Sequence, residues 1–231
     1  MRRLMCRAME EAVDRGECFM VLKPVAKELY WPYQFDYCFD FSGEKPSLPE
    51  DTGEGGLLSN RVLDHFVEQY KKAMESINAY GLRDRAYYEE VLRELSTEGG
   101  KCRILKDGYI LYYPDGMVRE WIGGGVVNNP NLDIMARMTD VKRLLSQLRF
   151  DGSIFAESTI ELRDIFLPEN NGRFRLIFRN GHCMVKKIDE KCDIICDISQ
   201  FTQLIFGYQE IGDPVLDQIF DHQENYFIEE V

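Results

Sequence analysis

The side chains best suited to bind a metal or to react as nucleophiles are seven cysteines, which are dispersed along the 231-residue chain: Cys6, Cys18, Cys38, Cys102, Cys183, Cys192 and Cys196. Cys192 and Cys196 are four residues apart, but no second pair and no nearby histidine completes a zinc ligand set. His182 precedes Cys183 in a predicted hairpin, where adjacent side chains point to opposite faces. We therefore expect no metal site. The odd, scattered set indicates reduced thiols in a cytoplasmic protein.

The negative charge of the chain argues against nucleic-acid binding. Forty acidic and 28 basic residues give a formal net charge of −12, and no basic stripe offsets the resulting repulsion of phosphate backbones. We expect no nucleic-acid partner. The charge would favour cationic ligands such as polyamines, although most acidic proteins are merely soluble. No apolar run approaches the ~20 residues that span a bilayer, so we expect no membrane partner and a cytoplasmic location.

The first forty residues predict a helix followed by a buried strand. An apolar stripe with helical spacing runs along their first half: Leu4, Met5, Ala8, Met9, Ala12 and Val13. Arg15 and Gly16 predict the end of this helix. The apolar run 18–22 is long enough for a buried strand and too short for a helix. A helix that feeds a buried strand is half of an α/β unit, so we expect a preceding strand upstream of Met1.

The middle of the chain predicts a linker, two helices and a β-meander. Residues 42–57 are rich in glycine, proline and acids, a composition typical of a linker. Apolar spacing predicts helices over 63–77 and over about 84–98. Two Asp-Gly pairs separate three β-rich runs over 102–122, and because such turns need positive φ they predict a three-stranded meander. This central segment covers 58–125, and the glycines and the Asn-Pro that follow predict the main domain boundary.

Residues 131–231 predict a second α+β domain. A strand over 134–138 and a helix after Asp140 are followed by several strands, two of whose turns carry Asn-Gly. Two more helices are expected over 199–206 and near 215–220. This pattern indicates an antiparallel sheet covered by helices. The fold class predicted for the whole chain is α+β.

A resemblance to one family is carried by five segments in order: residues 2–37, RDRAYYEEVLRELSTEGGKCRIL (83–105), DIMARMTDVKRLL (133–145), LPENNGRFRL and ISQFTQLIFGY. They resemble the bacterial acetyltransferases of the enhanced intracellular survival (Eis-like) family, a branch of the GCN5-related N-acetyltransferases (GNAT), in the compact form found in Firmicutes. The resemblance implies that 1–41 are the C-terminal remnant of a GNAT domain. It also implies that 131–231 form a sterol-carrier-protein-like domain.

The resemblance implies acetyl-CoA as co-substrate, but the chain departs from the family at the coenzyme site. The family's pyrophosphate loop, Arg/Gln-x-x-Gly-x-Gly/Ala, lies immediately before the helix that here begins at Met1 or Arg2, and this sequence does not contain it. We therefore expect a fragment, a truncated gene product or a degenerate homologue. Arg2 and Arg3 could approach a coenzyme phosphate from the first helical turn. They equally suit an exposed helix start, which we favour.

The family uses one general acid and one general base, and the resemblance places them near the two ends of this chain. The family's Tyr-x-x-Phe-Gly-Phe/Tyr loop matches YWPYQF, which makes Tyr30 the general acid and places Gln34 where the family prefers glycine. A phenol with a pKa of about 10 stays protonated at neutral pH and can donate to a departing thiolate. The C-terminal carboxylate of Val231 is the implied general base. The alternative role for Tyr30 is that of an aromatic side chain packed under its loop. The alternative for Val231 is a frayed chain end, although the apolar run 226–228 favours docking of the tail.

The resemblance thus implies an N-acetyltransferase that acts on a small-molecule primary amine by direct transfer, and it implies that this chain is an incomplete form of it. Because relatives assemble into oligomers, it also implies a homo-oligomer. The alternative is a non-catalytic binding or interaction module, in which the sterol-carrier-like domain holds an apolar ligand or a partner. Fold kinship alone does not transfer a ligand.

Overall fold

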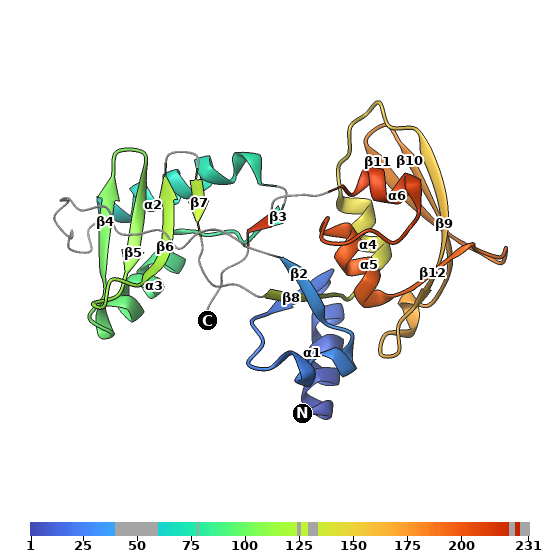
Figure 1. The fold of residues 1–231 in the computed structure, drawn as a ribbon, viewed down its shortest axis with the longest axis horizontal. Helices are drawn as coiled ribbons and strands as arrows, with labels where there is room; N and C mark the ends of the chain where they lie inside the picture. Colours follow the sequence, from blue (N-terminus) through green and yellow to red (C-terminus); the bar gives the residue numbers. More distant parts are fainter. Residues whose placement is uncertain (40–59, 78, 124–125, 129–133, 222–224, 227–231) are drawn as a thin grey trace. The chain divides into compact units, whose positions relative to one another are not determined.

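The computed structural model describes residues 1–39, 60–77, 79–123, 126–128, 134–221 and 225–226 (Figure 1). Its contacts divide the chain into two compact units. Unit 1 comprises 1–40 and 133–223, and unit 2 comprises 41–132 and 224–231. The predicted linker at 42–57, the glycine-rich boundary around 124–125 and Val231 lie outside the described residues.

Unit 1 begins with the predicted helix and strand. Helix α1 (Arg2–Arg15) ends at Gly16, whose φ of 75° provides the left-handed C-cap. Strand β1 (Phe19–Leu22) follows. Two 3-10 turns, η1 (Lys27–Leu29) and η2 (Trp31–Tyr33), then lead into strand β2 (Asp36–Phe39). The apolar stripe and the short apolar run therefore predicted the helix and the strand correctly, but the strand is not buried: three of its residues are half-buried and Val21 is exposed.

The centre of the first sheet is strand β8 (Ile134–Met138), which lies between β1 and β2 and is antiparallel to both. All five of its residues are buried. The strand at 134–138 was predicted, but its partners were not: it was expected to open the second domain, and it completes the sheet of the first forty residues instead. Nothing in a five-residue apolar run indicates which neighbours it pairs with.

The second sheet of unit 1 has the order β11-β10-β9-β12. Its strands are β9 (Ala156–Arg163), β10 (Gly172–Arg179), β11 (His182–Ile188) and β12 (Ile194–Asp197). The first three pair antiparallel, and β12 runs parallel to β9. The 3-10 turn η4 (Pro168–Asn170) precedes β10, and the helices are α4 (Val141–Gln147), α5 (Ile198–Ile205) and α6 (Pro214–Ile219).

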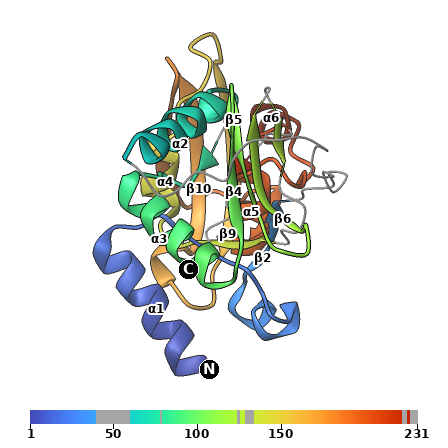
Figure 2. The same ribbon diagram turned by 90° about the vertical axis from the view of Figure 1, so that its left-hand side faces the viewer.

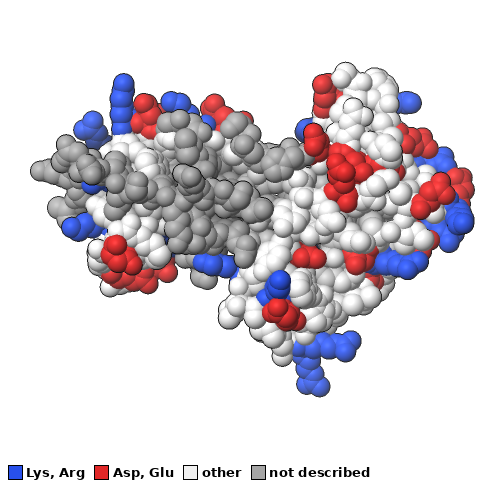
Figure 3. Space-filling model, viewed as in Figure 1, with Lys and Arg blue, Asp and Glu red and all other residues white. Residues whose placement is uncertain are grey.

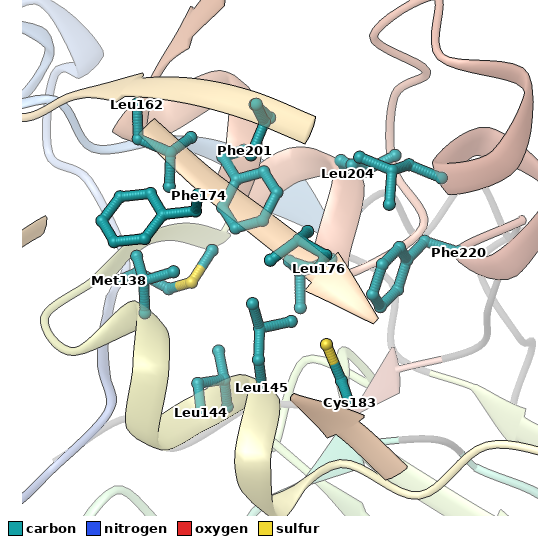
Figure 4. Close-up of a cluster of buried hydrophobic side chains, with 14 of the residues drawn as sticks. Met138, Leu144, Leu145, Leu162, Phe174, Leu176, Cys183, Phe201, Leu204 and Phe220 are labelled. Carbon is teal, nitrogen blue, oxygen red and sulfur yellow. The ribbon is translucent and has the colours of Figure 1, made fainter. Parts of the chain in front are cut away.

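Alternate residues of β9 and β10 face the core, as expected for a sheet with one covered face. Figure 4 shows the apolar side chains that α4, α5 and the sheet direct toward one another. Several of them are 0% exposed: Leu145, Ile160, Phe174, Leu176 and Phe201. The space around these five side chains is therefore filled by protein atoms.

Unit 2 packs two helices on a sheet (Figures 1 and 2). Helix α2 (Asn60–Ala73) continues into η3 (Met74–Ser76), and helix α3 (Arg85–Thr97) is capped by Asp84, whose carboxylate accepts from the Tyr87 amide. The sheet has the order β4-β5-β6-β7, with strands at Lys101–Leu105, Gly108–Tyr112, Val118–Gly123 and Val126–Asn128. A separate parallel pair joins β3 (Ala79–Tyr80) to β13 (Asn225–Tyr226).

The meander has one strand more than the sequence predicted. The glycines at 123–125 were read as a break, yet β7 returns from them to pair with β6, with Gly123 opposite Val126. Glycine is the common residue of tight hairpin turns as well as a strand breaker, so the signal was correct and its interpretation was wrong. The fold is α+β, as predicted. Among the described helices, none has the length and apolarity that a membrane span requires.

Candidate functional site

Tyr30 lies between the two 3-10 turns of unit 1. Its amide donates to the Lys27 carbonyl at 2.9 Å, and its own carbonyl accepts from the Tyr33 amide at 2.9 Å. The half-buried side chain packs against the cluster that includes Met5 and Met9 of α1. Among the described residues, its hydroxyl has no hydrogen-bond partner. The structure thus holds the backbone of Tyr30 firmly and leaves the phenol available.

Arg2 and Arg3 occupy the first turn of α1, and both are exposed. Neither guanidinium has an acidic partner among the described residues, and no side chain caps the start of this helix. Figure 3 shows Lys and Arg atoms projecting where α1 begins. Unpaired first-turn amides and adjacent cations suit an anion such as a phosphate. The observed exposure equally fits the solvated helix start that the sequence favoured.

Gln34 explains how this chain departs from the Tyr-x-x-Phe-Gly pattern. Its backbone adopts φ 60° and ψ 31°, the left-handed conformation for which glycine is best suited. Its side chain donates to the Arg163 carbonyl at 3.3 Å and accepts from the Ile165 amide at 2.9 Å. The glutamine therefore keeps the glycine-type turn and adds two bonds that tie the Tyr30 loop to the segment after β9.

A buried ion pair fastens the same two segments together. Arg137 and Asp164 have 0% exposed side chains, and the guanidinium Nη2 donates to Asp164 Oδ1 at 2.5 Å. Arg137 also donates to the carbonyl of Tyr33 at 2.9 Å and to that of Met138 at 2.7 Å. Burial lowers the pKa of Arg137, and the nearby Asp164 carboxylate opposes this shift. The pair spans β8, the Tyr30 loop and the turn after β9.

Asp164 accepts three further hydrogen bonds, all from N–H groups. Its Oδ1 accepts from the amides of Phe166 and Leu167 at 2.9 Å, and its Oδ2 accepts from Asn170 Nδ2 at 2.9 Å. The sequence reading missed both partners of this ion pair. The isolated arginine inside the apolar run IMARM was the signal that could have found Arg137, since an unpaired charge would not be buried in such a strand.

Unit 2 contains a second buried ion pair, between Arg83 and Glu120. Their side chains are 0% and 4% exposed, and Arg83 Nη1 donates to Glu120 Oε1 at 2.7 Å. The hydroxyl of Tyr226 donates to Glu120 Oε1 at 2.6 Å, and that of Tyr109 donates to Oε2 at 3.0 Å. The Arg83 guanidinium lies 4.3 Å from the centre of the Tyr70 ring, a cation–π geometry.

The predicted base, Val231, lies outside the described residues, and the last residues that the structure describes are Asn225 and Tyr226. The Tyr226 side chain is buried, at 1% exposure, and its carbonyl accepts from the Gly81 amide at 3.3 Å. Burial, followed by the Glu120 charge, raises the pKa of Tyr226 well above its ordinary value. Tyr226 of the predicted apolar run is thus buried, while the rest of that run lies outside the described residues.

A family comparison identifies the C-terminal part of the chain. Residues 141–227 match the sterol carrier protein domain. No curated protein matches the chain significantly. The sterol carrier domain so defined contains α4, α5, α6 and the four-stranded sheet of unit 1. It also contains Asp164 and therefore one half of the ion pair that holds the Tyr30 loop.

Solved structures with a similar fold include two that are described as GCN5-related N-acetyltransferases. A GCN5-related N-acetyltransferase from Kribbella flavida aligns with 100% of this chain and 76% of its own, with a TM-score of 0.71 and 16% identity. One from Anabaena variabilis aligns with 97% of this chain and 76% of its own, with a TM-score of 0.68 and 19% identity. Eis1 from Mycobacterium abscessus aligns with 96% of this chain and 76% of its own, with a TM-score of 0.66 and 15% identity. The chain has a GNAT-like fold combined with a sterol carrier domain.

An open groove of about 920 Å³ lies on unit 1, partly within the sterol carrier domain. Its lining mixes apolar side chains such as Val13, Leu167 and Val185 with exposed cations such as Arg143 and Lys186. These two cations make no ion pair with acids in the described part of the chain. The described residues contain no group of His, Cys, Asp and Glu that could hold a metal ion.

Proposed function

We propose that this protein is an N-acetyltransferase, in which acetyl-CoA supplies the acyl group and a small-molecule primary amine receives it. The observation that carries the proposal is the state of Tyr30: a half-buried phenol without a hydrogen-bond partner among the described residues, in a loop fastened by Gln34 and the Arg137–Asp164 pair. A proton donor needs this combination of a fixed backbone and an unengaged hydroxyl. The fold of the structural relatives supports the same reaction class.

The proton steps are assigned to the two residues that the family resemblance implies. The amine nitrogen forms a bond to the thioester carbon while the carbon–sulfur bond breaks. Tyr30 donates its proton to the leaving thiolate, and the C-terminal carboxylate of Val231 accepts the proton that the amine loses. Arg2 and Arg3 fit the role of holding coenzyme phosphates, since both are exposed, lack acidic partners among the described residues and flank the uncapped start of α1.

Steady-state acetylation of a panel of polyamines and aminoglycosides tests the proposal. We expect Tyr30→Phe to lower kcat roughly 100-fold or more, the usual contribution of a general acid. Tyr33→Phe is the matched control, because it removes the same atom from the same loop, three residues away, and Tyr33 has no role in the proton steps. Equal rates for both variants, or no heat of binding with millimolar acetyl-CoA, would sink the assignment.

A second candidate, a binding module, is favoured by the groove of about 920 Å³ on unit 1. Since the core side chains inside the sterol carrier domain are buried, an apolar ligand would lie in this surface groove. Titration with a fluorescent fatty acid tests it: binding weakened by Val185→Asp supports the module, and unchanged binding overturns it. The further partner expected, a second copy of the chain, is tested by light scattering at several concentrations.

A further inference from the structure

Strand β11 forms one edge of the four-stranded sheet of unit 1, where it pairs with β10. In such an edge strand, alternate residues direct their backbone N–H and C=O groups away from the neighbouring strand. Among the described residues, no backbone group outside β10 pairs with residues 183–187. The strand has seven residues, which is long enough to act as a template for one more strand.

The open groove of about 920 Å³ follows this edge, because four consecutive strand residues, 183–186, line it. Successive side chains of a strand point to opposite faces, so a groove on one face would be lined mainly by every second residue. Cys183 and Val185 pack on the core side, whereas Met184 and Lys186 are exposed. The groove therefore reaches both faces of β11, and they meet at its free edge. Most of the other lining residues come from α4, the turn η4 and the residues just before them.

The groove carries cations that the described part of the chain does not neutralise. Lys142, Arg143 and Lys186 line it, are exposed and make no ion pair with a described acid. Two acids also line it: Asp140, whose carboxylate accepts from the Arg143 amide as the cap of α4, and the exposed Glu169. Three cations against two acids leave the lining formally positive, in a chain whose net charge is −12. The groove therefore favours an anionic occupant.

The chemistry of the groove favours an extended peptide over other anions. Its lining also contains apolar side chains such as Val13, Leu167 and Met184, so an occupant must combine apolar groups with negative charge. A lipid offers both but cannot pair with the N–H and C=O groups of a strand edge, whereas an acidic peptide offers all three. A second copy of β11 is disfavoured, because it would bring its own Lys186 against the same cations.

We propose that this groove is a docking site for an extended acidic segment of a partner protein, which pairs with β11 as an additional strand. The backbone of the segment takes up the free N–H and C=O groups of the edge. Its apolar side chains contact Val13 and Leu167, and its carboxylates pair with Arg143 and Lys186. The inference is independent of acetyl transfer. It assigns a peptide to the groove that the second candidate function assigns to an apolar ligand.

Fluorescence anisotropy of a labelled octapeptide in which Glu and Val alternate tests the docking site. We expect saturable binding that Lys186→Glu weakens at least about fivefold, because a cross-strand pair of opposite charges becomes one of like charges. Lys187→Glu is the matched control: it makes the same change of charge at the next residue of β11, but Lys187 does not line the groove. Both lysines are exposed, so neither substitution should disturb the fold. Equal binding by the two variants, or equal affinity of the original protein for a Lys-Val octapeptide, overturns the proposal.

Backbone N-methylation of the octapeptide tests the added strand itself. One derivative carries N-methyl groups on its valines and another on its glutamates, so both keep the charge of the parent peptide. Only one of the two alternate sets of N–H groups faces β11 in an added strand. We therefore expect one derivative to lose at least about tenfold in affinity and the other to bind like the parent. Equal effects of the two derivatives overturn strand pairing. If the parent octapeptide does not bind, the proposal is overturned, and oleate binding that Lys186→Glu weakens would then assign the groove to a lipid.

Discussion

Two buried ion pairs among the described residues each hold a buried carboxylate, but with different partners. Asp164 in unit 1 receives Arg137, two backbone amides and the Asn170 side-chain amide. Glu120 in unit 2 receives Arg83 and two tyrosine hydroxyls. Every partner of Asp164 is an N–H group that can only donate. The hydroxyls around Glu120 can rotate and accept as well. The carboxylate charge is therefore indispensable in unit 1 and more replaceable in unit 2.

The two carboxylates also differ in the segments that they connect. Two of the four groups that donate to Asp164 are backbone amides, which no substitution of their residues by another amino acid with an N–H group removes. The Glu120 pair holds its strands through side chains, and a single substitution such as Tyr226→Phe can detach one of them. The chain contains two tryptophans, and Trp31 lies in unit 1 while Trp121 lies in unit 2. Each unit can therefore be followed separately.

The largest effect is expected for Asp164→Asn. An asparagine amide would point its own N–H₂ group at donors that cannot accept, and it would leave the buried Arg137 without a counter-charge. We expect a loss of about 3–5 kcal/mol in the free energy of unfolding of unit 1. Urea unfolding followed by Trp31 fluorescence in a Trp121→Phe background measures it. Glu11→Gln is the control, because its exposed pair with Arg7 should contribute nothing measurable.

Glu120→Gln is the isosteric change in unit 2, and we expect it to cost less. The Arg83 guanidinium keeps the rings of Tyr70 and Tyr87 at 4.3 and 4.7 Å, and the tyrosine hydroxyls can accept from the new amide. A loss of about 1.5–3 kcal/mol is expected, the range for a hydrogen bond to a charged group. Trp121 fluorescence in a Trp31→Phe background reports it. A loss as large as that of Asp164→Asn would contradict the comparison.

Substitutions of Gln34 test how far the Tyr30 loop depends on backbone geometry. Gln34→Gly relieves the left-handed strain of about 1–2 kcal/mol but loses two hydrogen bonds of about 1 kcal/mol each. We expect its stability to lie within about 1 kcal/mol of the original protein, since these terms nearly cancel. Gln34→Val loses both bonds and is β-branched at φ 60°, so it should destabilise unit 1 by at least about 2 kcal/mol. Similar losses for both variants would show that the bonds matter and the conformation does not.

The sequence predicted elements well and their long-range partners poorly, for a physical reason. Helical spacing and Asp-Gly turns are local, so α1 and the first three strands of the meander followed from them. The pairing of β8 with β1 and β2 joins residues about a hundred positions apart, and no local pattern encodes it. Tyr30 could be singled out only by resemblance. Gln34 looked like a defect in the motif, because its two bonds to residues 163 and 165 form only in the folded chain.

The smallest effect concerns alkaline pH, and it distinguishes the two ion pairs by the chemistry of their partners. Burial raises the pKa of Tyr88, Tyr109 and Tyr226, which all belong to the Glu120 network. The unfolded chain ionises these phenols near their ordinary pKa of about 10. Their contribution to the stability of unit 2 is therefore complete below pH 10 and is lost as the pH rises further. The Asp164 network contains no phenol.

Phenolate absorbance during an alkaline titration measures this directly. We expect these three of the twelve tyrosines to ionise only when unit 2 unfolds, later than the exposed ones. Tyr226→Phe should remove one third of the delayed signal. Stability itself is a poorer readout, because the thiols of Cys183 and Cys196, whose pKa burial raises to about 12, give unit 1 an alkaline loss of its own. If all twelve phenols titrate together near pH 10, the Glu120 network is open to water, and the contrast between the two ion pairs fails.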